Sequence, residues 1–506
     1  MSITHVDLRR GAYHDSVTLL QVSRTVAGVE GVEAAQVAMA TELNVEVLTG
    51  MGFDVPEGAA PNDLVVAVRA ADEDAVAAGV AAADAALSAK AAPSGGFGDA
   101  PPPRTTGAAI RAGGAEIALI SVPGRYAATE ALDAIGAGAS VMLFSDNVPV
   151  EDELMLKDAA AAADVLVMGP DCGTAVVGGV ALGFANVVSA GPIGMVAASG
   201  TGAQQLMCLL DAAGVGISHC LGVGGRDLTS AVNGRSTRQA LAALAADPAT
   251  TSIVVVSKPP DEAVLTDLES YAGGLGLPVR WATLGAGRPD LTSALEAVLE
   301  AEGHAVPEWP KWVSDSDPQP GSVSGSLRGL FCGGTLADDA MLLAAETLGD
   351  IRSNIPLRED LALGSDLKHD GHLVIDFGDD GLTQGRAHPM IDPTLRMERI
   401  AAEAADPNCG VLLLDLVLGY GAHQDPAGEL AEAIRAAKQS ARDRSPSSKR
   451  AGMAPDLPVV VSVTGTEGDP QGLTRTAETL AAAGASVFLS NRDATRHALT
   501  FLGSQS

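Results

Sequence analysis

The chain has 506 residues, of which 47% are hydrophobic and only 3% aromatic, and its formal net charge is −31. This length predicts roughly three or four domains of ~100–200 residues, with cores of Ala, Val, Leu and Ile, as in parallel sheets covered by helices. The large negative charge disfavours nucleic acids and anionic membrane surfaces as partners.

The cysteines are far apart and form no Cys-x-x-Cys pair, and the first residues do not read as a secretory leader. They stand at Cys172, Cys208, Cys220, Cys332 and Cys409. This pattern is typical of reduced thiols in a cytoplasm rather than of disulfides or a zinc site. No apolar run approaches the ~20 residues of a membrane span. We therefore expect a soluble cytoplasmic protein with no metal site.

Residues 1–90 alternate short strands and helices. The pattern predicts a helix over 16–26, strands over 32–39 and 63–70, and an Ala-rich helix over 71–90. This is the length and order of a ferredoxin-like α+β module, which could bind a small regulator, pair with another module or serve only in packing. Residues 91–114 are rich in Pro and Gly and predict a linker.

A regular alternation of strands and helices occupies residues 115–190. Strands are expected over 117–122, 140–144 and 165–168, and helices over 129–136 and 152–163. Short apolar strands that alternate with helices predict a compact parallel unit of the doubly wound, Rossmann-like type.

Two further α/β units are expected over residues 191–305 and 328–506, separated by a Pro-, Gly- and Ser-rich linker at 306–327. Both open with a strand, a small-residue turn and a helix. Both also carry an Ala-Asp-Pro triplet before an apolar strand, at Ala246-Asp-Pro248 and Ala405-Asp-Pro407. The shared order predicts two copies of one design. Their strands are expected at 253–257 and 279–284, and at 329–332, 373–376, 411–416 and 459–463.

The turns that open these two units are candidate anion sites, because free backbone N–H groups and the positive end of a helix bind phosphate or carboxylate groups. From spacing alone, a tight turn without a ligand is equally open, since the chain has neither a P-loop nor a Gly-x-Gly-x-x-Gly motif. The residues are Ser199, Gly200, Thr201 and Gly202 before a helix expected over 204–213, and Gly333, Gly334 and Thr335 in the other copy.

Several segments carry a family resemblance. They are Gly169-Pro-Asp-Cys-Gly-Thr-Ala175, Leu182-Gly-Phe-Ala-Asn-Val-Val188, Ala198-Ser-Gly-Thr-Gly202, Gly214-Val-Gly-Ile-Ser-His219 and Gly224-Gly-Arg-Asp227. Together they resemble the FdrA proteins, relatives of succinyl-CoA synthetase, and the resemblance covers nearly the full chain. It implies an α/β fold with a CoA-binding Rossmann-like unit and two flavodoxin-like units of the succinyl-CoA synthetase type, beside the ferredoxin-like module.

The resemblance also indicates what this chain lacks. Succinyl-CoA synthetases carry phosphate on a histidine in a Gly-His-Ala-Gly motif, where this chain reads Ala282-Thr-Leu-Gly-Ala-Gly287. The segment whose glutamate supports that histidine is replaced by Ser257-Lys-Pro-Pro260, and no ATP-grasp domain is recognisable. A nucleotide-driven ligase acting alone is therefore not expected, whereas anion handling without a covalent carrier is.

The resemblance to the FdrA-type subunit of oxamate carbamoyltransferase implies a role in allantoin breakdown. That enzyme interconverts oxamate plus carbamoyl phosphate with oxalurate plus phosphate, and works with two other protein types. No cofactor is certain, CoA remains possible, and self-association through Ala-rich faces is plausible. Two alternatives stay open: an acyl-CoA synthetase whose partner supplies the nucleotide site, and a non-catalytic scaffold or sensor.

Arg386 and His388 form the candidate catalytic pair. They combine a planar anion clamp with a group that exchanges protons near neutral pH. A purely structural role is the more frequent one for a lone histidine in a loop.

Four residues are candidates for substrate binding: Asp171, Cys172, Asn186 and Arg226. Cys172 stands where a related loop of succinyl-CoA synthetases contacts CoA, although a buried structural thiol is the alternative. Arg226 could bind a carboxylate or could pair with Asp227 across its turn. The sequence offers no cluster of ligands that would demand a metal.

Overall fold

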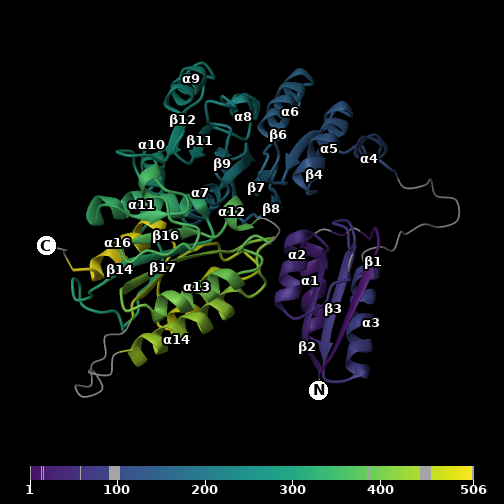
Figure 1. The fold of residues 1–506 in the computed structure, drawn as a ribbon. Helices are drawn as coiled ribbons and strands as arrows, with labels where there is room; N and C mark the ends of the chain where they lie inside the picture. Colours follow the sequence, from purple (N-terminus) through teal and green to yellow (C-terminus); the bar gives the residue numbers. More distant parts are fainter. Residues whose placement is uncertain are drawn as a thin grey trace. The chain divides into compact units, whose positions relative to one another are not determined.

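The computed structural model describes residues 2–12, 14, 16–56, 58–89, 103–383, 387–444 and 457–503. The chain divides into two compact units, Met1–Pro102 and Pro103–Thr383 with His388–Ser506 (Figure 1). Each unit is described by itself below. Three of the four expected modules fall within the second unit.

The N-terminal unit is a three-stranded antiparallel sheet with helices, in the order β1-β3-β2. Helices α1 and α3 pack on one face of the sheet, where Val22 and Ala83 share a buried cluster with Val66 of β3. Leu48 of α2 and the following Phe53 cover the other face. The predicted α+β module is confirmed, while β1 and α2 were not predicted. The elements are β1 (Ile3–Arg9), α1 (Ser16–Ala27), β2 (Val32–Met39), α2 (Glu42–Gly50), β3 (Leu64–Ala70) and α3 (Glu73–Ala89).

The Rossmann-like part of the second unit has three parallel strands in the order β4-β5-β6. Part of the expected linker is a helix, α4, whose first turn is capped by Thr105 and which ends at Gly114 in the left-handed conformation (φ 63°). The elements are α4 (Thr106–Gly113), β4 (Ile117–Ile120), α5 (Gly124–Gly136), β5 (Ser140–Leu143), α6 (Val150–Ala162) and β6 (Val167–Met168).

The second sheet has six strands in the order β12-β11-β9-β10-β7-β8. The β7–β8 hairpin belongs to this sheet through an antiparallel contact of β7 with β10, although its residues were expected in the preceding unit. The elements are β7 (Thr174–Val177), β8 (Val180–Gly183), β9 (Ala190–Ala198), α7 (Gly200–Ala212), β10 (Ile217–Gly222), α8 (Arg235–Ala246), β11 (Ser252–Ser257), α9 (Glu262–Ala272), β12 (Val279–Thr283) and α10 (Leu291–Ala301).

The third sheet has seven strands in the order β13-β19-β18-β17-β14-β16-β15. All neighbours are parallel except β13, which pairs antiparallel with β19 from within the expected linker. The elements are β13 (Lys311–Trp312), β14 (Ser326–Phe331), α11 (Gly334–Leu348), β15 (Arg352–Ser353), η1 (Glu359–Leu361), β16 (Leu373–Asp376), α12 (Asp380–Thr383), α13 (Thr394–Ala405), β17 (Cys409–Val417), α14 (Pro426–Arg444), β18 (Val459–Thr464), α15 (Leu473–Ala482), β19 (Ser486–Phe488) and α16 (Asn491–Phe501).

The two large sheets repeat one design, as predicted. Strands β10-β9-β11-β12 and β16-β14-β17-β18 follow the same 2-1-3-4 order, which is the flavodoxin-like one. The Ala-Asp-Pro triplets end α8 and α13, with Asp247 and Asp406 in almost the same extended conformation. The predicted fold class is therefore confirmed.

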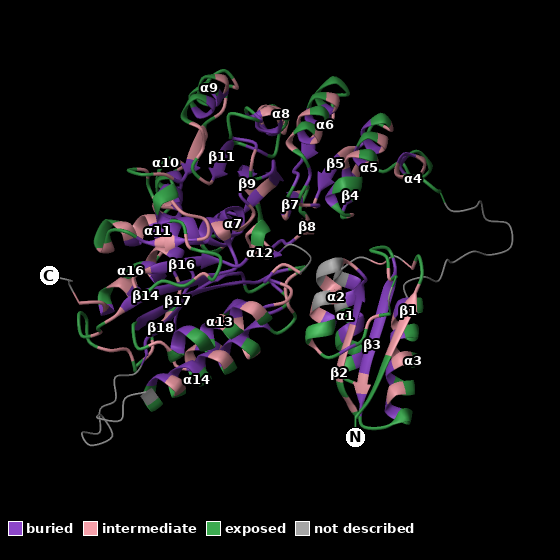
Figure 2. Cartoon of the chain, in the orientation of Figure 1, coloured by how far each residue is buried: buried purple, intermediate pink, exposed green. Residues whose placement is uncertain are grey.

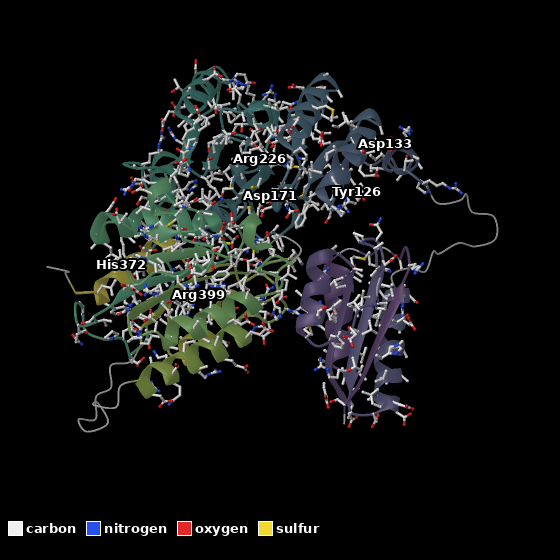
Figure 3. All side chains as sticks on the ribbon, viewed as in Figure 1. Tyr126, Asp133, Asp171, Arg226, His372 and Arg399 are labelled. Carbon is white, nitrogen blue, oxygen red and sulfur yellow. The ribbon has the colours of Figure 1, made fainter. Side chains whose placement is uncertain are left out.

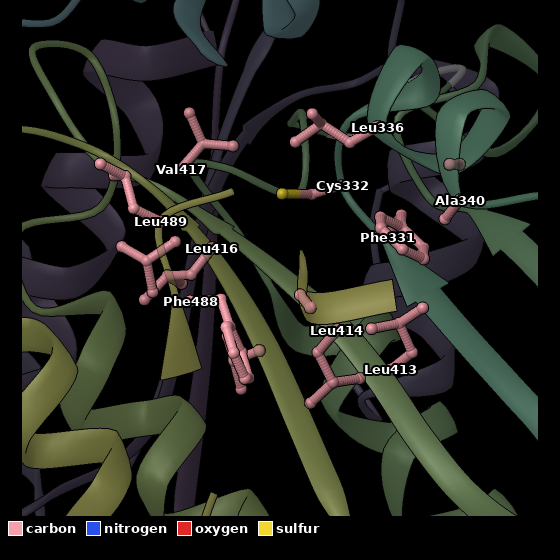
Figure 4. Close-up of a cluster of buried hydrophobic side chains, with 14 of the residues drawn as sticks. Phe331, Cys332, Leu336, Ala340, Leu413, Leu414, Leu416, Val417, Phe488 and Leu489 are labelled. Carbon is pink, nitrogen blue, oxygen red and sulfur yellow. The ribbon is translucent and has the colours of Figure 1, made fainter. Parts of the chain in front are cut away.

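Both copies share one hydrophobic core. Helices α7 and α10 pack against α11 and α16, and Leu206, Leu295, Leu336 and Ala494 from these four helices are fully buried in the same cluster. Figure 2 shows the strands of the sheets as mostly buried, and Figure 4 shows α11 side chains meeting those of the third sheet. The two copies are thus one packed body.

A buried ionic network fastens the Rossmann-like part to the second sheet. The Nζ of Lys157 on α6 is fully buried and lies 2.8 Å from Glu153, 2.7 Å from Asp227 and 3.0 Å from the carbonyl of Val223. Asp227 also accepts hydrogen bonds from the first turn of α8, including the Thr237 amide at 2.9 Å. One lysine therefore joins α6 to α8.

Candidate functional site

The two candidate anion turns meet. Ser199 follows β9 and caps α7 by accepting from the Gly202 amide at 3.0 Å, while Thr335 lies in the first turn of α11. The Ser199 and Thr335 hydroxyl oxygens are 2.5 Å apart, and a Cβ on Gly333 would lie 2.9 Å from Thr201. The positive ends of two helices consequently converge on one place.

Sheet order explains why these turns carry the site. In a flavodoxin-like sheet, ligands bind at the carboxyl ends of the strands where the order reverses. Here that place is between β9 and β11 in one copy and between β14 and β17 in the other. Asp415 on β17 holds the second turn in position, because its carboxylate accepts from the Cys332 and Gly333 amides at 2.8 and 2.9 Å.

Lys258 is the residue that sequence reasoning missed. It follows β11 directly, is half-buried, and places its Nζ 3.0 Å from where a Cβ on Gly334 would stand. Burial alone would lower the pKa of Lys258, but nearby carboxylates, Asp338 and Asp376 first, outweigh burial and raise it. It forms no ion pair with any described residue. One feature of the sequence could have indicated this residue. The family resemblance places a negatively charged glutamate in this segment, where this chain has the positively charged Lys258.

Two carboxyl groups of the second copy, one at the end of β16 and one on α11, face this lysine. Asp376, at the end of β16, accepts from the Gly378 amide at 2.8 Å through Oδ1, and its Oδ2 lies 2.6 Å from the position of a Cβ on Gly334. Burial raises the pKa of Asp376 to about 7 and that of Asp338, on α11, to about 6. Both groups can therefore change charge near neutral pH.

Asp171 brings the Rossmann-like part to the same region. It is solvent accessible, takes a left-handed conformation (φ 55°), and donates its amide to the carbonyl of Ser145 at 3.0 Å. Desolvation of the carboxyl group and the charge of Asp380 raise the pKa of Asp171 to about 7. The positive charges of Lys258 and Arg226 oppose this shift. Figure 3 labels Asp171 and Arg226.

Arg226 does not pair with Asp227, which corrects that alternative. Its Nε donates to Glu153 at 3.0 Å and its Nη2 to the carbonyl of Val148 at 2.8 Å. Asp227 is instead the buried partner of Lys157. Arg226 therefore reaches a ligand only with those nitrogen atoms that Glu153 and Val148 leave open.

Burial favours the neutral form of His388 near pH 7. Burial lowers the pKa of its imidazole to about 4. Its Nδ1 accepts from the Met390 amide at 3.3 Å, its ring lies 5.5 Å from that of Phe184, and its Nε2 lies 2.8 Å from the Cβ position of Gly378. With Nδ1 accepting, the neutral imidazole carries its proton on Nε2, which is a hydrogen-bond donor beside the Asp376 loop, and the role of His388 in proton exchange stays a prediction. Arg386 lies outside the described residues.

Asn186 and Cys172 are held by structural contacts. The amide of Asn186 donates to Asp469 at 2.8 Å and to the carbonyl of Leu418 at 3.0 Å, and its oxygen accepts from Gln204 at 3.1 Å. Cys172 is 3% exposed, and burial raises the pKa of its thiol to about 12. All five cysteines are buried free thiols. The two candidates therefore lie near the site without a free polar atom directed to a ligand.

The loop after β12 holds no carrier histidine. Arg288 in this loop donates to both carboxylate oxygens of Glu262 at 2.8 Å and to Thr283 at 3.0 Å. Within the described ranges, no group of three or more His, Cys, Asp or Glu side chains is placed to hold a metal ion. In the same ranges, no helix has the length and apolar character needed to cross a membrane.

Family models and a bacterial relative match large parts of this chain. Residues 1–102 match the family model described as AllF, heavy metal-associated domain, although they contain no cysteine, and residues 330–501 match the CoA-ligase model. The chain is 36% identical over 501 residues to YahF of Escherichia coli K12, which covers 94% of each chain.

Two further comparisons concern CoA ligases. The chain is 30% identical over 156 residues to the α subunit of the ADP-forming succinate–CoA ligase of Aquifex aeolicus, covering 30% of this chain and 50% of that subunit. The dinucleotide-forming acetyl-coenzyme A synthetase 1 of Ca. Korarchaeum cryptofilum, solved with phosphate and ADP, is 15% identical with a TM-score of 0.28, over 76% of this chain and 82% of that one.

Proposed function

The chain belongs to the FdrA-like family that includes YahF and is related to succinyl-CoA synthetase, and on this basis we propose that it is a subunit of a carbamoyltransferase of the oxamate type. The reaction interconverts oxamate and carbamoyl phosphate with oxalurate and phosphate. In this proposal two other protein types complete the enzyme, and no covalent carrier takes part.

The meeting of the α7 and α11 N-termini carries the proposal. Ser199 and Thr335 touch there at 2.5 Å, the Lys258 ammonium stands over Gly334, and the histidine that would carry phosphate covalently is absent from the loop after β12. Two helix N-termini and a lysine ammonium are suited to bind a phosphate group that forms no covalent bond with the protein. A phosphorylated donor that transfers its group directly needs such a site.

The chemistry asks the protein mainly for position and charge. The oxamate nitrogen attacks the carbamoyl carbon, a C–N bond forms, and the C–O bond to phosphate breaks with its electron pair remaining on the phosphate oxygen. The proton released by the nitrogen passes to the leaving phosphate. Holding both anions in line and stabilising the departing phosphate accelerates such a step without a nucleophilic side chain.

Phosphorolysis of oxalurate tests the proposal. The full chain, alone and with the products of its neighbouring genes, is mixed with oxalurate and phosphate, and carbamoyl phosphate is followed. Ser199→Ala and Thr335→Val are expected to lower kcat/KM by about 10–100-fold, because each removes a hydroxyl at the phosphate site. Thr266→Val, at an exposed helix hydroxyl that bonds only to Glu262, is the matched control.

Other results would contradict the carbamoyltransferase. The CoA-ligase match at 330–501 makes an acyl-CoA synthetase the second candidate. It would be favoured if no carbamoyl phosphate formed from oxalurate and if turnover required CoA and a nucleotide. Full turnover by both variants in the reconstituted complex would instead indicate a scaffold whose partner does the chemistry.

Anion binding is expected to strengthen as the pH falls. Asp376 and Asp338, with pKa values of about 7 and about 6, become neutral on protonation and then no longer repel an anion beside Lys258. Sulfate, whose charge does not change in this range, should bind about tenfold more tightly at pH 5.5 than at pH 8.5. Calorimetry at constant ionic strength measures this. Asp338→Asn should flatten the lower part of the profile, and an affinity independent of pH would exclude these carboxyl groups from the site.

A further inference from the structure

One buried acceptor and one donor meet over Gly334. A Cβ on that glycine would lie 2.6 Å from Asp376 Oδ2 and 3.0 Å from Lys258 Nζ. The aspartate comes from the end of β16 and the lysine from the end of β11, so that each copy of the repeated design contributes one group. Both groups come this close to the backbone of residue 334 because that residue has no side chain.

Both groups have unused hydrogen-bonding capacity. Asp376 is 3% exposed, and only its Oδ1 accepts a hydrogen bond from a described residue, the Gly378 amide. Within the described part of the chain Lys258 has no ion-pair partner. Asp376 Oδ2 and Lys258 Nζ therefore remain available as an acceptor and a donor for a ligand.

A donor beside an acceptor is the complement of a primary amide. The carbonyl oxygen of –C(=O)NH₂ accepts from an ammonium, and its N–H donates to a carboxylate. We infer that Lys258 and Asp376 read the primary amide edge of the substrate, and so select carbamoyl and oxamate groups over acetyl and other acyl groups. This inference rests on the proposed function and names the specificity element of that same site.

Gly334 supports this assignment because it has no side chain. It is the first residue of α11, directly after the N-cap Gly333. A methyl group there would displace the Asp376 carboxylate and the lysine. Gly334→Ala therefore moves both groups away from their positions over residue 334.

Oxamate and pyruvate provide a matched pair of probes, since they differ only in NH₂ against CH₃. Titration calorimetry on the full chain should show oxamate binding at least about tenfold more tightly than pyruvate, because the methyl group leaves the Asp376 acceptor unpaired. Asp376→Asn keeps an oxygen for the Gly378 amide and turns an NH₂ toward the ligand NH₂. This variant and Gly334→Ala should both reduce the preference to about threefold or less. Gly136→Ala, at a helix end with free space around its Cβ position, is the control.

The outcomes separate this inference from the proposed function. If the wild type does not prefer oxamate, or if both variants keep the preference, the amide site is wrong even where oxalurate phosphorolysis succeeds. The opposite result is that the wild type prefers oxamate, both variants lose this preference, and phosphorolysis fails in the full mixture. In that case the amide site is supported and the carbamoyltransferase is contradicted.

Discussion

Lys258→Glu is expected to lower oxalurate phosphorolysis by a factor on the order of 10² or more. The substitution adds a further acid to a region that already holds Asp171, Asp338, Asp376, Asp379 and Asp380, and removes the ammonium that faces Gly334. Two anionic substrates would then meet only the helix ends and the partly engaged Arg226 as positive charge among the described residues. Steady-state kinetics of carbamoyl phosphate formation and calorimetry with sulfate measure the two consequences separately.

Matched variants sharpen this result. Lys258→Met removes the charge with little change in length and should lie between wild type and Lys258→Glu, whereas Lys258→Arg should retain part of the activity. Lys311→Glu reverses a charge at an exposed surface pair with Glu308 and should leave both readouts unchanged. Equal sulfate affinity in wild type and Lys258→Glu would show that the anion binds elsewhere.

Lys157→Met is expected to cost about 3–5 kcal/mol of stability in the Rossmann-like part, because it leaves the buried carboxylates of Glu153 and Asp227 without their shared cation. The loss should reach α8, since Asp227 also accepts from the Ser236 amide at 3.2 Å and from the Thr237 hydroxyl at 2.6 Å. Hydrogen exchange of the α6 and α8 amides measures the loss locally, which suits a chain of several domains.

Arg235→Gln is the control for this comparison. The Arg235–Asp158 pair also joins α8 to α6, at 2.8 Å, but both side chains are partly exposed. Its removal should cost no more than about 1 kcal/mol. If the two variants changed protection equally, the buried lysine would not be the fastening between these elements.

Local patterns were sufficient for most of the fold. Short apolar runs predicted β9, β11, β14 and β16, small-residue turns marked the starts of α7 and α11, and the Ala-Asp-Pro triplets predicted the repetition, because these signals lie within a few residues of one another. The β7–β8 hairpin was expected in the preceding unit, since its sheet is decided by a contact of Cys220 with Val176 that no local pattern encodes.

The site was predictable only in part, for the same reason. Ser199 and Thr335 carry a local signature of a helix start, and the structure brings them together. Lys258 follows β11 and Asp376 ends β16, and no local pattern indicates that the order of two sheets makes them neighbours. Burial, which raises the pKa of Asp376 and lowers that of His388, likewise depends on residues far away in the chain.

The core shared by α7, α10, α11 and α16 has the character of an obligate dimer interface enclosed within one chain. Either half, separated from the other, would expose the fully buried Leu206 or Leu336 faces to water. The connecting segment between the halves therefore acts as a tether that fixes their stoichiometry at one to one, and every folded molecule carries both the lysine and the aspartate over Gly334 in a fixed relation.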